Sequence, residues 1–323
     1  MAEKATVFQT TQIGVQTAVG TAVPANKVLG ATELIIQPRN EAETIRPLGM
    51  KYPTGVSQDK EWGEVTIGGK PAFQDLCYIL SGLVHYSAPA QVDLTTAYTW
   101  TFGTNTTSED VGKYFTLEQG DSANAWQIKD VKFGGVTLNF SRSGIGISGT
   151  GYGSKIDTTV TKTATPTVIQ SVPIAPAMVK LYMADTQAAL AGATAYSRSF
   201  SLDWNLTDKF ALAWPIGSDP FQVEGVPTNT ARLTVATDTN GMALVGKLRD
   251  GSTKWFRIQA IGPVIDGAIT HKLTIDFPAK VAELGDMNDQ EKVWVIQYGL
   301  QPVHDATWTK ALDIQIVTDL EAL

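Results

Sequence analysis

The pattern closest to a cofactor-binding motif is a run of three glycines, Gly144, Gly146 and Gly149, in SGIGISG. Their spacing matches G-x-G-x-x-G, which binds a dinucleotide only when a helix starts directly after it and points its N–H groups at the pyrophosphate. The next residues, TGYGSK, continue a glycine-rich alternation and predict no helix. We therefore interpret the glycines as part of a hairpin or bulge between close strands, and we predict no cofactor.

Residues able to bind a metal ion are scattered along the sequence. The three histidines, His85, His271 and His304, lack the H-x-x-x-H or H-E-x-x-H spacing of a zinc site. The acidic stretch DMNDQE (286–291) lacks the glycine and distal glutamate of a calcium loop. The single cysteine, Cys77, lies in an apolar stretch and is expected to be a small buried side chain. We predict no metal site.

The sequence also offers no arrangement typical of nucleophilic or acid–base catalysis. The G-x-S-x-G motif of a nucleophile elbow is absent, and the few histidines suggest no Ser-His-Asp set. No pair of carboxylates lies in an apolar setting that would raise the pKa of one of them. We predict no catalytic residues and a protein that is not an enzyme.

Composition excludes further classes of function. The chain has 323 residues, of which 43% are hydrophobic, and its formal net charge is -7 without any run of lysine and arginine. A basic groove that reads DNA sequence is therefore not expected. No stretch approaches the roughly 18 continuous apolar residues of a membrane helix, and the first residues do not resemble a secretory signal. We expect a soluble protein that folds in a reducing cytoplasm and has no membrane partner.

The elements that would position any functional side chain are mostly β-strands. Apolar and polar residues alternate with a period of two from about Leu34 onward, in segments rich in Thr, Val and Ile. Short helices are expected after Asp75 and after Asn240, each of these residues serving as a cap. The clearest predicted strands lie at 98–102, 114–118, 136–141, 231–237, 254–261, 271–277, 292–298 and 312–317.

Two halves of the chain resemble one another. At an offset of 168 residues and without gaps, 33–49 lies over 201–217, so that Leu34 meets Leu202 and Gly49 meets Gly217. The same offset places 64–69 over 232–237, and the first predicted helix over the second. The segment 158–177, rich in Thr, Pro and Ala, lies between the halves and is typical of an extended connector. Coincidence between two unrelated β domains remains the alternative.

Several segments resemble, in order, those of phage tail tube proteins. GVQTAVGTAVPANKVL (14–29) resembles the arm that precedes the first strand of that family. YFTLEQGD (114–121) resembles its strand ending in Thr-Leu-Glu, and 131–153 resembles its paired strands around a turn. RSFSLDWNLTDKFALAWPIG (198–217) resembles the start of the second half of its longer members.

This resemblance implies a structural protein of the virion tail, assembled in the cytoplasm of the bacterial host. Family members are β-sandwiches with a small helix, and their rings stack into a tube whose barrel surrounds viral DNA without binding it specifically. Two tandem units in one chain imply a ring of three chains with pseudo-sixfold symmetry, and six chains per ring is the alternative. Tape-measure, tail terminator and distal tail proteins are the other implied partners.

We accordingly predict a mainly β protein with two tandem tail-tube-like units, each with a short flanking helix. The predicted parts are an N-terminal arm (1–30), a first β domain (31–157), a linker (158–177) and a second β domain (178–323). The arm from Lys4 to Leu29 should be poorly ordered in a free subunit. Its branched apolar side chains are the predicted subunit interface, because they need partners to be buried: Val15, Val19, Val23 and Val28.

A non-catalytic carbohydrate-binding or adhesive β-sandwich is the alternative function, because eight tryptophans and nine tyrosines could stack on sugars. The tryptophans are spread evenly through the sequence, which favours packing roles over a single sugar cleft.

Overall fold

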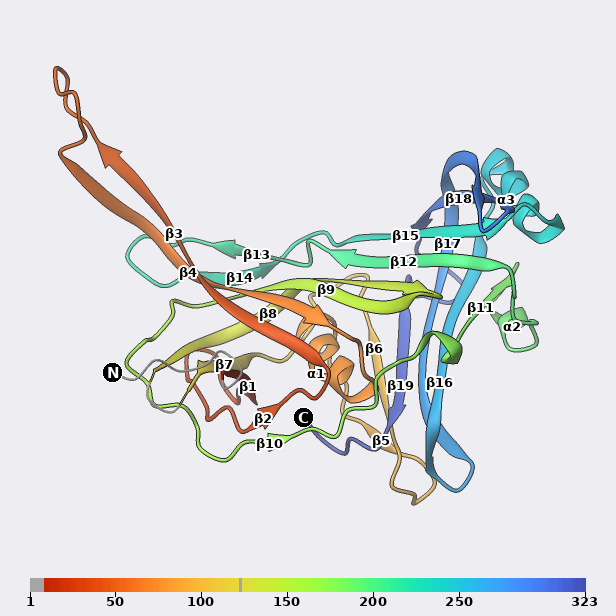
Figure 1. Cartoon of the computed structure of the whole chain (residues 1–323), viewed down its shortest axis with the longest axis horizontal. Helices are drawn as coiled ribbons and strands as arrows, with labels where there is room; N and C mark the ends of the chain where they lie inside the picture. Colours follow the sequence, from red (N-terminus) through yellow and green to blue (C-terminus); the bar gives the residue numbers. More distant parts are fainter. Residues whose placement is uncertain (1–8, 122–123) are drawn as a thin grey trace.

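A computed structural model of the chain describes residues 9–121 and 124–323. The described residues lie mainly in β-strands, which confirms the predicted class. Figure 1 shows a body of long strands from which one hairpin projects far outward. None of the helices in the described part of the chain combines the length and the apolar character needed to cross a lipid bilayer.

Strands of the first half follow one another in a continuous antiparallel order. That order is β1, β7, β8, β9, β4 and β3. Their bounds are β1 (Thr10–Val15), β7 (Phe115–Gly120), β8 (Ala125–Ser141), β9 (Gly144–Gly153), β4 (Gly55–Gly69) and β3 (Thr32–Ile45). The first half and the connector hold four further strands: β2 (Lys27–Val28), β5 (Ala90–Gln91), β6 (Tyr98–Gly103) and β10 (Thr167–Val168).

Strands of the second half repeat that order. Here β11, β16, β17, β18, β15 and β12 pair in turn, all antiparallel. Their bounds are β11 (Val179–Ala184), β16 (Lys254–Asp266), β17 (Ile269–Gln290), β18 (Val293–Pro302), β15 (Thr228–Ala236) and β12 (Ser199–Thr207). A separate hairpin is formed by β13 (Phe210–Ala213) and β14 (Phe221–Glu224), and β19 (Asp313–Thr318) follows at the end.

The strand registers refine the gapless offset of 168 residues. Leu34 pairs with Ile67 in the first half, and its counterpart Leu202 pairs with Leu233, which lies 166 residues beyond Ile67. Gly49 and Gly217 both adopt a left-handed backbone at the turn between these strands, so the offset of 168 holds up to the turn. After the turn the second half is two residues shorter. The alignment of 64–69 with 232–237 is therefore displaced by two residues.

Both predicted helices form, but their caps differ from the prediction. The helices are α1 (Phe73–Leu83), α2 (Gln187–Leu190) and α3 (Thr239–Asp250), with a 3-10 turn η2 (Pro176–Met178). Asp75 lies inside α1, and its carboxylate accepts hydrogen bonds from the N–H groups of Ala31 and Thr32 at 2.9 and 2.8 Å. In α3 the cap is Asp238 rather than Asn240, since its side chain accepts from the N–H of Gly241.

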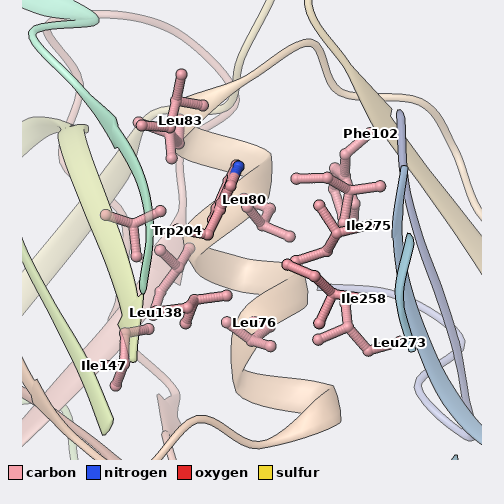
Figure 2. Close-up of a cluster of buried hydrophobic side chains, with 14 of the residues drawn as sticks. Leu76, Leu80, Leu83, Phe102, Leu138, Ile147, Trp204, Ile258, Leu273 and Ile275 are labelled. Carbon is pink, nitrogen blue, oxygen red and sulfur yellow. The ribbon is translucent and has the colours of Figure 1, made fainter. Parts of the chain in front are cut away.

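The two halves share one hydrophobic core. Figure 2 shows Leu76 and Leu80 of α1 between side chains of both halves, such as Leu138 on one side and Ile258 on the other. Backbone pairing also joins the halves, because β12 pairs with β8 and β19 pairs with β6. The predicted domains 31–157 and 178–323 are therefore packed together, and the first set of equivalent strands also takes in β1 from the predicted arm.

The segments predicted to be an arm and a linker run along the first half. Residues up to 8, including the expected start of the arm at Lys4, lie outside the described residues. From Thr10 onward, β1 pairs with β7 along its whole length and buries Ile13, so this part of the arm is a strand of the fold. In the linker, β10 pairs in parallel with β2, and the hydroxyl of Ser171 donates to the carboxylate of Asp75.

Candidate assembly surface

The glycine-rich motif lies inside a strand. Gly144, Gly146 and Gly149 belong to β9, which forms a hairpin with β8 and pairs on its other side with β4. This is the predicted hairpin, and no helix N-terminus lies after the glycines to hold a phosphate. Gly149 approaches its neighbours closely, because a Cβ there would overlap the carbonyl oxygen of Gly135. A Cβ added at Gly144 or Gly146 would meet no atom within 4 Å.

The histidines do not come together. His85 accepts a hydrogen bond from the N–H of Val111 at 3.3 Å, and His271 in β17 stacks on Phe73 with 5.5 Å between ring centroids. Burial lowers the pKa of His271 and raises that of the Cys77 thiol. His304 lies in the loop after β18. Within 9–121 and 124–323, no three side chains of His, Cys, Asp or Glu are grouped to hold a metal ion.

The tryptophans are spread over the molecule, and four of them form two separate pairs, Trp62 with Trp214 and Trp255 with Trp308. Trp100 and Trp204 are fully buried, whereas Trp126 and Trp294 are exposed in different halves. Trp62 of β4 meets Trp214, next to β13, edge to face at 5.4 Å, a contact between the two halves. This distribution gives no row of exposed rings on one surface and matches the packing roles expected from the sequence.

The junction between the halves is an antiparallel pairing of β8 with β12. It covers six residue pairs, from Ser201 opposite Ser141 to Leu206 opposite Val136. Trp204 lies opposite Leu138, and both side chains are buried in the shared core. On the other face of the sheet, the side-chain amide of Asn139 donates to the carboxylate of Asp203 at 2.9 Å. Apolar packing on one face and a polar pair on the other therefore fix this junction.

The strand of the first half that is equivalent to β12 is β3, and no described strand pairs with its outer edge. Among the described residues β3 pairs only with β4. The N–H of Ile36, the counterpart of Trp204, points to this outer edge and donates to the side-chain oxygen of Gln119 at 2.6 Å. Pro38, two residues further, has no N–H to offer there, which is typical of an edge strand.

The strand of the second half that is equivalent to β8 is β17, and it also has an unpaired edge. Beyond Ala279, the described part of the chain pairs β17 with β18 alone. Leu284 and Met287 lie opposite the buried Tyr298 and Ile296, yet they are 44% and 50% exposed. Each strand that joins the halves therefore has a counterpart at an open edge, and the edge of β17 carries uncovered apolar side chains.

Residues of β8 can be matched to residues of β17 because the β8–β9 and β17–β18 hairpins end in the same way. β8 has one register shift against β9, after Phe133, whereas β17 has two against β18, after Val281 and after Leu284, so the two strands are aligned from their hairpin ends. The β8–β9 hairpin ends with Ser141 opposite Gly144, and the β17–β18 hairpin ends with Gln290 opposite Val293. Counted back from the hairpin ends, Leu138 is equivalent to Met287, and their partners Ile147 and Ile296 are equivalent by the same count.

The four valines predicted as interface residues are not gathered at either edge. Val15 ends β1 and packs against the core, and Val28 pairs with Val168 of β10. Val23 donates its N–H to the hydroxyl of Thr116, and Val19 is largely exposed. Nothing in the described residues places a neighbouring copy on them, so their role remains a prediction.

The projecting β3–β4 hairpin is a second exposed apolar surface (Figure 1). Its outer part carries uncovered side chains at Ile45, Leu48, Tyr52 and Val56. The corresponding turn of the second half lies between β13 and β14, where Ile216 is exposed like Leu48. Such side chains far from the core are typical of a surface that meets another molecule.

Sequence reasoning missed the open edges, because edge position depends on long-range pairing. Pro38, directly after the apolar residues 34–36, was a local signal, since proline is confined to edges of sheets. No protein-family model matches this chain, and no curated protein matches it either, so its function has to be argued from the geometry.

Proposed function

We propose that the chain is a structural subunit that assembles with copies of itself into closed rings, and that these rings stack into the tail tube of a long-tailed bacteriophage. The observation that carries the proposal is the repeated strand order, with one copy of a junction formed and its two counterpart edges open. Two equivalent units joined edge to edge leave two open edges. One is β3, the counterpart of β12, and the other is β17, the counterpart of β8.

Such ends favour a head-to-tail ring. When the rotation from one unit to the next divides a full turn, heterologous contacts close and no edge remains free. Three chains would fill six equivalent positions, and six chains per ring is the alternative arrangement. Closure would also cover Leu284 and Met287 and remove two strand edges that otherwise invite aggregation.

The side chains on the outer face of the junction suit a conduit for DNA. Thr137, Asn139, Asp203 and Asn205 alternate with the core residues of β8 and β12 and carry no positive charge, and the exposed Arg232 of β15 on the same face lies opposite Asp203. A surface of this kind does not bind phosphate strongly, so DNA would pass without being held. Tape-measure, terminator and distal tail proteins would be the partners at the ends of such a tube, and the virion tail its location.

Electron microscopy of the purified full-length protein tests the proposal. We expect rings or stacked tubes with a central channel, and threefold symmetry in a reconstructed cross-section. Sedimentation of the same sample should show a discrete species with the mass of three chains or a multiple of it. A protein that stays monomeric at high concentration, in the presence and absence of salt, would contradict the proposal.

A further inference from the structure

The register of the β8–β12 junction within the chain predicts the register of the junction between two copies. Trp204 of β12 is equivalent to Ile36 of β3 by the offset that holds up to Gly49, and Leu138 of β8 is equivalent to Met287 of β17 by the hairpin landmarks. Because Trp204 lies opposite Leu138, we propose that Ile36 of one copy pairs with Met287 of the next in an antiparallel ladder. This inference rests on the proposed ring.

The same register sets the neighbouring pairs. Ile35 would lie opposite Asn288, because their counterparts Asp203 and Asn139 lie opposite each other. Glu33 would lie opposite Gln290. Both Ile35 and Asn288 are exposed in the subunit, and so is Gln290. The apolar side chain of Met287 would then face the same side of the sheet as Ile36, which is buried in the core of its own copy. The pairing therefore keeps apolar side chains on the core face.

The backbone of Ile36 is oriented for this pairing. Its N–H does not point to β4, since it already donates to the side-chain oxygen of Gln119 at 2.6 Å across the open edge. In an antiparallel ladder a residue whose N–H points at the partner strand exchanges two hydrogen bonds with the residue opposite. The carbonyl of Met287 would take the place that the Gln119 amide oxygen occupies. Gln119 thus caps the edge in the single subunit and must be displaced when the ring closes.

Disulfide trapping tests the register. Ile35 and Asn288 would form a pair without mutual hydrogen bonds, in which Cα atoms are about 4.5 Å apart, within the range that a disulfide spans. In full-length protein carrying Ile35→Cys and Asn288→Cys, mild oxidation should give covalent dimers and trimers on a non-reducing gel. The natural Cys77 is buried, so the unchanged chain serves as the control for background cross-linking.

A matched variant carries Ile35→Cys with Gln290→Cys, which places the second thiol on the same face two residues away. Its cross-linking should be at least tenfold slower. If the protein forms rings by electron microscopy but the Gln290→Cys variant cross-links faster than the Asn288→Cys variant, the proposed register is wrong and the proposed function still holds. An absence of rings in the unchanged protein would instead refute the proposed function.

Hydrogen exchange tests the role of Gln119. In the single subunit, Gln119→Ala should speed exchange of the Ile36 amide, and ring formation should begin sooner because no cap is left to displace. In assembled rings the Ile36 amide should be protected in both proteins. Slower assembly by Gln119→Ala, or an Ile36 amide that stays unprotected in rings, would overturn the proposed pairing.

Discussion

Replacing Lys209 by methionine should cause a large loss of stability, because this lysine is buried between two carboxylates. Its Nζ atom lies 2.6 Å from Oδ2 of Asp110 and also contacts Oε1 of Glu224. The side chains of Lys209 and Asp110 are 1% and 0% exposed. Asp110 lies in the loop before β7, and Glu224 ends β14, so this cluster joins a loop of the first half to the hairpin of the second.

The expected magnitude follows from this burial. Lys209→Met keeps most of the side-chain volume but leaves the fully buried carboxylate of Asp110 and the partly buried carboxylate of Glu224 without this positive partner. Breaking a buried pair in this way costs about 3 to 5 kcal/mol. The matched control is Lys60→Met, since Lys60 Nζ also lies 2.6 Å from a carboxylate, that of Glu41, but both side chains are well exposed at 38% and 56%. An exposed pair contributes roughly 0 to 1 kcal/mol.

Urea unfolding of both variants, followed by circular dichroism at low protein concentration, gives the two free energies of unfolding. Adding Asp110→Asn to Lys209→Met should recover part of the loss, because it removes one uncompensated charge. Equal stabilities for Lys209→Met and Lys60→Met would refute the claim that this buried cluster joins the halves.

Three further changes test other parts of the fold. Gly149→Ala should lower the free energy of unfolding by about 1 to 3 kcal/mol, because its Cβ would overlap the Gly135 carbonyl. Gly146→Ala should leave the free energy of unfolding unchanged, because its Cβ would meet no neighbouring atom. Calorimetry should find no ATP or NAD binding in either variant. Asp75→Ala should cost about 2 to 4 kcal/mol in the same assay and speed proteolysis near residues 30–32, whose N–H groups lose their acceptor. Burial holds the pKa of His271 below its ordinary 6.5, so the unfolded chain binds the proton first and stability falls as pH drops below about 6.5. His271→Phe should flatten that dependence in urea unfolding between pH 7 and 5, and an unchanged slope would exclude His271 as its source.

Local sequence patterns predicted the strands well, because alternation records which side chains face the core. The segments 254–261 and 312–317, for example, lie within or along β16 and β19. The helix caps were predicted less well. Asp75 matched the residue type of a cap, but its carboxylate is used by the backbone of 31–32, which is distant in sequence.

Features that depend on long-range pairing could not be read from the sequence. The alternation along β17 shows which residues face the core, but not that its second half lacks a neighbour on one side. Nothing in the local sequence covers the four valines, yet the strand β7 and the segment around Val168 lie close to two of them. The repeat was detectable, whereas the two-residue difference after its turn required the registers.

The single core around α1 has a consequence for the midpoint of the chain. A cut within 158–177 would divide the protein into two pieces, but the β8–β12 and β6–β19 pairings and the buried side chains between them would still hold the pieces together. Either piece made alone would expose Leu138 or Trp204 to water. Besides its own contacts with the first half, the connector therefore ensures that each half is synthesised together with one partner half.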